Sequence, residues 1–289
     1  MNRRAMLATS VAGAAALGLL SDKAPAKPRR PRNDDSPDVK AAVAGGVAYF
    51  SRRCDEQRVL CQALENAIKS GDLAAARRAY VESRPPYEEI ETLAYAFEDT
   101  DRDIDARPYA FEAGETSDDF RGFHRIEVLL FGHDDVASAL PYAEGLTRSV
   151  RTLKGQLGEQ DRFDAAGQFG GMLALSNEVA AKKISSEEEA WSDQSLLIFK
   201  HNWIGVMSQF KPFAPLVARE NQSAADRVIA AHQAAQDTLK PYFREGVVAA
   251  TPYTSVSMSE RRAMADASNR FRDALAQAGV VIGLDVGIQ

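Results

Sequence analysis

The sequence has only two cysteines, and after residue 20 it has no apolar run long enough to cross a bilayer. Cys54 and Cys61 stand seven residues apart in a helical pattern, which separates them by roughly 10 Å along a helix axis. That separation is too large for a disulfide within one helix. We therefore expect two reduced core residues.

Motifs of several enzyme and binding classes are also missing. There is no glycine-rich phosphate loop, no Ser-His-Asp order and no basic patch with interleaved aromatic residues. The formal net charge of −6 disfavours nucleic acid as a partner and suits a cationic ligand. No stretch keeps the alternation of a β-strand, so the sequence predicts an all-α protein.

The first 26 residues have the pattern of an export signal. Arg3 and Arg4 precede a mild apolar stretch that is rich in small residues, and Ala24-Pro25-Ala26 fits a cleavage site. The arginine pair resembles a twin-arginine signal, with an ordinary Sec signal as the alternative. Cleavage would take the net charge from −6 to −8, because it removes three basic residues and one acidic residue. Residues 27–35 are expected to be a disordered lead-in, and we expect a periplasmic or extracellular protein.

The remaining chain, residues 36–289, is typical of a helical bundle. Apolar spacing predicts one long helix over residues 37–69, a second over 73–81 and a third over 87–97, after a break at Pro85 and Pro86. Residues 99–117 have the composition of an irregular loop, and a further helix begins at Asp118 or Asp119. Later helices are expected over 138–157, 162–183, 193–209, 222–243 and 258–278, and two bundle-like halves could meet near residue 160.

Two pairs of side chains at helical spacing could bind a metal ion. Glu88 and Glu91 are three residues apart, and so are His124 and Glu127 in an H-x-x-E pattern. Residues at i and i+3 share one helix face, and bundle proteins build iron and manganese sites from such pairs. Two pairs and one loop aspartate would suit Fe, Mn or Zn. The structural alternative is a core histidine, a solvated Glu91, and Glu88 and Glu89 paired with Arg84.

A calcium loop is a competing hypothesis. The carboxylates of Asp101, Asp103, Asp105 and Glu112 fall at positions 1, 3, 5 and 12 of an EF-hand-like loop. Ala106 stands where the loop needs glycine, and Pro108 stiffens its middle. Both features weigh against calcium at this position.

Three ordered motifs resemble the imelysin family, and within it the branch of EfeO-like periplasmic iron-uptake components. They are the run from Ser83 to Glu91, the segment around Asp101 and Ile104 to Arg107, and Gly122 to Glu127. The resemblance implies two related four-helix-type bundles that form one domain, in a short form without a cupredoxin domain. It also implies a metal-binding cleft whose ligands are Glu88, Glu91, Asp105, His124 and Glu127, with Glu187 as a further candidate.

The function that the resemblance implies is metal binding in iron uptake, with iron as the expected ion and Zn, Mn or Ca as alternatives. An inner-membrane iron permease and a haem peroxidase would be the partners. Two other hypotheses are a metallopeptidase, although Val128 stands where H-E-x-x-H-like spacing needs a second histidine, and a protein that binds acidic polysaccharide. The chain departs from the family pattern at Phe120, at Ser186 and after Trp191, which leaves a second ion site in doubt.

Overall fold

A computed structural model describes residues 36–186 and 188–285, and every regular element within these ranges is helical. The expected signal peptide and the lead-in lie outside the described residues. The α-helices are α1 Pro37–Lys69, α2 Leu73–Ile90, α3 Glu98–Asp105, α4 Phe123–Glu127, α5 Leu140–Gln156, α6 Ala165–Glu178, α7 Ile184–Ser186, α8 Ser195–Phe210, α9 Ala214–Leu239 and α10 Met258–Val281. Two π-helical segments extend α4 and α6, Val128–Gly132 and Val179–Lys183, and short 3-10 helices cover Glu91–Ala96, Pro108–Ala110, Gly114–Thr116, Gln160–Arg162, Lys240–Tyr242 and Tyr253–Ser255.

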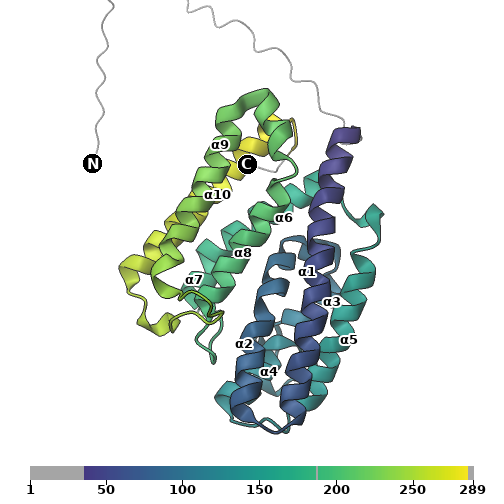
Figure 1. The fold of residues 1–289 in the computed structure, drawn as a ribbon, viewed down its shortest axis with the longest axis vertical. Helices are drawn as coiled ribbons and strands as arrows, with labels where there is room; N and C mark the ends of the chain where they lie inside the picture. Colours follow the sequence, from purple (N-terminus) through teal and green to yellow (C-terminus); the bar gives the residue numbers. More distant parts are fainter. Residues whose placement is uncertain (1–35, 187, 286–289) are drawn as a thin grey trace, which may run out of the picture. The chain divides into compact units, whose positions relative to one another are not determined.

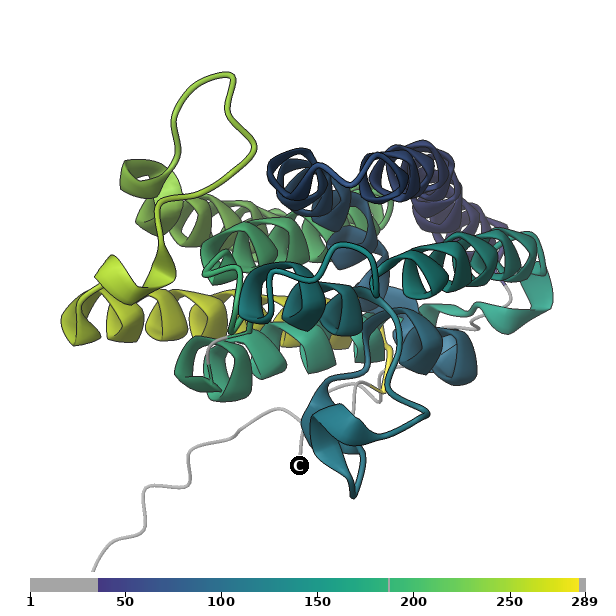
Figure 2. The ribbon, with the colours of Figure 1, turned by 90° about the horizontal axis from the view of Figure 1, so that it is seen from below.

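The helices pack in two groups. In the first, α1 lies against α2 and α5, and α3 lies against α5; in the second, α10 packs on α9 and α6, and α8 packs on α6 and α9 (Figures 1 and 2). Contact between α2 and α8 joins the groups. The predicted all-α class is confirmed. Within the described ranges, no helix combines the length and the apolar character that a membrane span requires.

Helix α1 begins and ends where the sequence predicts. Ser36 caps it by accepting a hydrogen bond from the Val39 N–H at 3.3 Å, and Pro37 follows at the first helical position. Cys54 and Cys61 lie on its buried face and are both free thiols, as predicted. The buried stripe of this helix forms one wall of the core of the first group.

The predicted break at the two prolines is wrong. Helix α2 continues through Pro85 and Pro86 to Ile90, and both prolines are buried. A proline removes one helical hydrogen bond and disfavours the helix by about 3 kcal/mol in isolation. Here α1 and α8 both pack against α2, so burial of its apolar surface offsets that cost. As a result, Arg84 and Glu88 lie one helical turn apart on one continuous helix.

Two further boundaries differ from the sequence prediction. Residues 98–105 form α3 rather than a loop, so Asp101, Asp103 and Asp105 are helical and cannot wrap an ion as an EF-hand loop does. The calcium-loop hypothesis is therefore wrong. The helix expected to begin at Asp118 or Asp119 begins at Phe123 instead, after Gly122 with φ 83°.

Candidate metal centre

A fully buried arginine lies at the centre of the polar interior. The guanidinium of Arg84 is 2.8 Å from Asp105 Oδ1, 2.6 Å from Glu88 Oε1 and 2.8 Å from Glu189 Oε1. A buried charge is tolerated only when it is paired and hydrogen-bonded. Arg84 therefore brings together carboxylates from α2, from the end of α3 and from the segment before α8. Of the structural alternative considered from the sequence, the pairing of Glu88 with Arg84 is confirmed, whereas that of Glu89 is wrong, because Glu89 pairs with Arg53.

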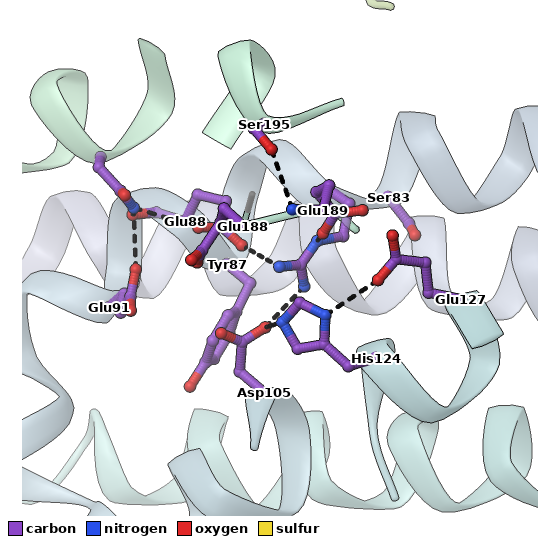
Figure 3. A network of polar contacts seen from close by, with 12 residues as sticks. Ser83, Tyr87, Glu88, Glu91, Asp105, His124, Glu127, Glu188, Glu189 and Ser195 are labelled. Carbon is purple, nitrogen blue, oxygen red and sulfur yellow. Dashed lines mark hydrogen bonds and ion pairs between the residues drawn. The ribbon is translucent and has the colours of Figure 1, made fainter. Parts of the chain in front are cut away.

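His124 lies on α4 between two carboxylates (Figure 3). Its Nδ1 is 3.1 Å from Glu127 Oε2, and its Nε2 is 3.6 Å from Asp105 Oδ1. The imidazole is 1% exposed, and Nε2 has no hydrogen-bond partner within the described part of the chain. A buried nitrogen whose contact with a carboxylate is longer than a good hydrogen bond is incompletely satisfied, so this atom is a candidate ligand.

Close backbone contact places His124 beside Asp105. A Cβ atom at Gly122 would lie 2.2 Å from the carbonyl oxygen of Ile104, and the positive φ of Gly122 strains any other residue. Glycine thus lets the start of α4 touch the end of α3. The contact brings the imidazole within reach of the Asp105 carboxylate.

Glu127 is held by both the backbone and the imidazole. Its Oε1 accepts hydrogen bonds from the N–H groups of Trp191 at 3.0 Å and Ser192 at 2.8 Å, and its Oε2 faces His124. Burial alone would raise the pKa of Glu127, but the hydrogen bonds from His124 and the two backbone amides outweigh it and lower the pKa. Glu127 is therefore an ionised carboxylate that fixes the orientation of the ring.

The segment between α7 and α8 supplies two acidic side chains that sequence reasoning did not select. Glu188 Oε1 lies 2.9 Å from Lys183 Nζ and also pairs with Arg107, and a ligand atom of Glu188 lies within 4.8 Å of ligand atoms of Asp105 and His124. Glu189 accepts hydrogen bonds from Tyr80 and Ser192, and it forms a similar group with His124 and Glu127. Glu187, the predicted candidate, lies outside the described residues.

Glu88 and Glu91 occupy the side of the cluster away from His124. Lys183 Nζ is 2.8 Å from Glu91 Oε2, and the Asn202 amide donates to Glu88 Oε2 at 3.1 Å and to Glu91 Oε2 at 2.8 Å. The interpretation of Glu91 as a solvated side chain is therefore wrong. Burial raises the pKa of Glu88, against the opposing effect of Arg84.

Carboxyl groups outnumber permanent cations in this interior. We define the carboxylate cluster as ten residues: Glu88, Glu91, Asp105, Glu127, Glu188 and Glu189, with Arg84, Arg107, Lys183 and His124. Its six carboxyl groups outnumber its three permanent cations by three, but burial raises the pKa of Glu88 and of Glu189, so only part of this excess is negative charge. Burial lowers the pKa of His124, but Asp105 and Glu127 outweigh that effect and raise the pKa to about 9. A proton on the ring therefore offsets part of the excess, and a metal cation could replace it.

A cavity of about 420 Å³ borders the cluster. Glu91, Asp105 and Arg107 belong both to its wall and to the cluster, and Asp101 lies beside them. An ion could therefore reach the Asp105 side of His124 from this cavity. Burial raises the pKa of Asp101 to about 7, although its hydrogen bond from Tyr87 acts in the opposite direction.

The fold and the site together define an all-helical protein with a buried cluster of histidine and carboxylates. The Imelysin (peptidase M75) family model matches residues 56–281. The chain belongs to the imelysin family.

Sequence alignments with known relatives extend over most of the chain. It is 31% identical over 265 residues to the iron uptake system component EfeO of Yersinia pseudotuberculosis, a match that covers 91% of this chain and 68% of the relative. It is 29% identical over 248 residues to the iron uptake system component EfeM of Pseudomonas syringae pv. syringae, covering 86% of each. EfeO of Escherichia coli K12 is 31% identical over 84% of this chain, which spans 64% of that relative.

The fold also resembles a solved structure. A protein described as an iron-regulated protein A precursor from Parabacteroides distasonis aligns with a TM-score of 0.61 over 90% of this chain and 95% of that one, at 16% identity. This likeness supports the helical architecture alone.

Proposed function

We propose that the protein is a periplasmic component of an iron-uptake system and binds an iron ion as its cargo in the carboxylate cluster. Two relatives that align along most of the chain carry the name of iron uptake system component. The observation that carries the proposal is the buried His124 Nε2, which contacts Asp105 only at 3.6 Å and lies in a group with Asp105 and Glu188 whose ligand atoms are within 4.8 Å of one another. One imidazole and several carboxylates suit iron.

Three ligands stand out on the Nε2 side of the ring. His124, Asp105 and Glu188 each offer an atom within 4.8 Å of the other two, and Asp105 also lines the neighbouring cavity. Glu127 then acts as the carboxylate that orients the imidazole, because its own oxygens already face His124 Nδ1 and two backbone amides. Glu88 and Glu91 affect the charge beside the ion. Both lie close enough to Lys183 for its ammonium to shift from one carboxylate to the other when an ion enters.

The test is calorimetric titration of the purified protein with iron alone. The variants Asp105→Asn and Glu188→Gln keep side-chain shape and should weaken binding by more than the ~10–100-fold expected for Glu127→Gln, which only orients the ring. Asp103→Asn is the matched control, because this neighbour on α3 pairs with Arg121 outside the cluster. Wild-type affinity should be retained in that control.

The outcomes separate the two sides of the ring. If the double variant Asp105→Asn/Glu188→Gln binds normally and Glu127→Gln/Glu189→Gln does not, the ion lies on the Nδ1 side. Normal binding in both double variants would contradict the proposal.

A binding role fits the cluster better than peptide hydrolysis. A metallopeptidase needs an open metal position for water and a carboxylate free to act as a base. Glu127, the carboxylate next to His124 on α4, instead accepts two backbone amides and faces the ring, and Val128 stands where an H-E-x-x-H helix needs a second histidine. Incubation with casein and metal should therefore give no cleavage above that of the Asp105→Asn variant.

Export and partners are part of the same proposal. Residues 1–26 would direct the chain to the periplasm, where an iron permease and a haem peroxidase would be the partners; acidic polysaccharide is the alternative ligand. Fractionation of cells that express the full chain tests the location. Replacement of Arg3 and Arg4 by lysine should block export if the twin-arginine route is used.

A further inference from the structure

A second and larger cavity lies on the other side of α2. Its volume is about 980 Å³, and its walls come from α1, α2, α8, α9 and the segment that follows α9. Leu60, Pro85, Leu239 and Phe243 are among the apolar side chains of the wall. Pockets of about 300–1,000 Å³ are the size that encloses small organic ligands.

One end of this cavity is rigidly built. Glu89, which is 2% exposed, receives Arg53 through two contacts, Nε to Oε2 at 2.9 Å and Nη2 to Oε1 at 3.0 Å. It also accepts the Tyr49 hydroxyl at 2.6 Å and lies 2.8 Å from His201 Nδ1. The wall residues Arg53 and His201 are therefore held in place before any ligand arrives, which lowers the entropic cost of binding.

Lys200 is a half-buried cation in this wall to which an anionic ligand could bind. Its ammonium lies 4.1 Å from the centroid of the Phe243 ring, and Lys200 forms no ion pair within the described residues. Burial lowers the pKa of Lys200, in keeping with partial loss of water. Arg244, at the rim, likewise has no acidic partner among the described residues, whereas Lys240 is paired with Asp237.

Acidic side chains are also present in the wall, but none of them forms an ion pair with Lys200. Glu56 is paired with Arg53. Glu82 and Glu245 are exposed and therefore hydrated. An incoming carboxylate or sulfonate would find the half-buried Lys200 beside an aromatic ring, and its apolar body would cover the prolines and leucines.

We infer that this cavity binds a small organic anion with an apolar, ring-sized body. The anionic group contacts Lys200, and the body lies against Pro85, Leu239 and Phe243. Val247 and Val248, which are 51% and 42% exposed, form the outer wall and lose solvent contact when the ligand is bound. This site shares no residue with the carboxylate cluster, so the inference does not depend on iron binding.

The experiment uses two fluorescent probes of the same shape on the full chain without added metal. The anionic probe is 8-anilinonaphthalene-1-sulfonate, and the neutral one is N-phenyl-1-naphthylamine. We expect saturable binding of the anionic probe at one site per chain. Lys200→Met, which keeps the apolar stem, should weaken that probe about tenfold, the effect of one charge-assisted contact, and should leave the neutral probe unchanged.

Two further variants keep the test decisive. Lys211→Met, at the end of α8 and outside the cavity wall, should bind both probes as the wild type does. Leu60→Trp, which fills the cavity, should weaken both probes, with thermal unfolding as a check that the variant is folded. Equal loss of both probes in Lys200→Met, or unchanged binding in Leu60→Trp, would overturn the inference. Loss of probe binding as the chain self-associates would also overturn it, because the cavity would then be an interface between copies.

Discussion

Glu88 and Glu89 are consecutive residues of α2, yet they belong to two different polar networks. Glu88 is 2.6 Å from Arg84 inside the carboxylate cluster, whereas Glu89 is 2.9 Å from Arg53 beside the large cavity. Successive side chains on a helix point about 100° apart, so one turn of α2 serves both networks. The position and stability of this turn therefore affect two sites at once.

Loss of the central arginine should be severely destabilising. Arg84→Met leaves Asp105, Glu88 and Glu189 without their buried partner, and removal of one member of a buried ion pair costs about 3–5 kcal/mol. Urea unfolding without metal measures the loss. Arg78→Met, an exposed change on the same helix, should stay within about 0.5 kcal/mol of the wild type. A small effect of Arg84→Met would mean that the cluster does not need its counter-charge.

Two glycines in helices should respond in opposite directions to alanine. A Cβ at Gly205 would lie 2.3 Å from the carbonyl oxygen of Glu89, so Gly205→Ala should force α8 away from α2 and cost about 1–3 kcal/mol. Gly170 has nothing within 4 Å of that position, and Gly170→Ala should stabilise by about 0.5–1 kcal/mol. Thermal unfolding of both variants checks the pair. Equal shifts of the same sign would contradict the close contact of α2 and α8.

The free energy of unfolding should fall with acid through His232. Burial, with a smaller effect of Lys211, lowers the pKa of His232 to about 4, from 6.5 in the unfolded chain. The unfolded state binds the proton more tightly, so this stabilisation is complete above pH 6.5 and is lost as the pH falls toward 4. The loss is about 1–2 kcal/mol, since the ring keeps some solvent contact.

His232→Leu keeps an apolar contact with Phe271 and removes the titration. The difference in unfolding free energy between wild type and variant, measured at pH 7 and pH 5, should change by that amount. A difference that does not vary with pH would contradict the assignment.

Both thiols should be unreactive in the folded protein. Burial raises the pKa of Cys54 and of Cys61 to about 12, so little thiolate exists at pH 8. Reaction of the two thiols with a disulfide reagent should be slow in buffer, whereas in denaturant both thiols of each chain should react. Rapid labelling without denaturant would show that α1 opens locally.

The sequence predicted the long helices because their apolar faces repeat with helical spacing. Helix α1 matches its predicted range, since a cap, a proline and an uninterrupted apolar stripe all agree. The continuation of α2 through Pro85 and Pro86 depends on packing against α1 and α8, which a local rule for proline does not include. Helix α3 was missed because its acidic run has almost no apolar periodicity.

In the candidate site, too, local patterns predict some residues, whereas others depend on tertiary contacts. His124, Glu127 and Asp105 could be selected from motifs and are found together. Glu188 and Glu189 were visible as part of an acidic run, but no local pattern tells that these two side chains turn inward. Contacts with Arg107, Tyr80 and Arg84 decide that, and each comes from a distant part of the chain.

The two buried prolines of α2 have a consequence for how the protein is assembled. A peptide that contains only this segment cannot be expected to stay helical beyond Glu82, because neither proline supplies an amide hydrogen and short helices are marginal in water. The turn that carries Arg84, Glu88 and Glu89 therefore forms only once neighbouring helices enclose it. Docking of the helices and formation of the polar interior are then one event, and an ion has no preformed site to bind before the surrounding helices have packed.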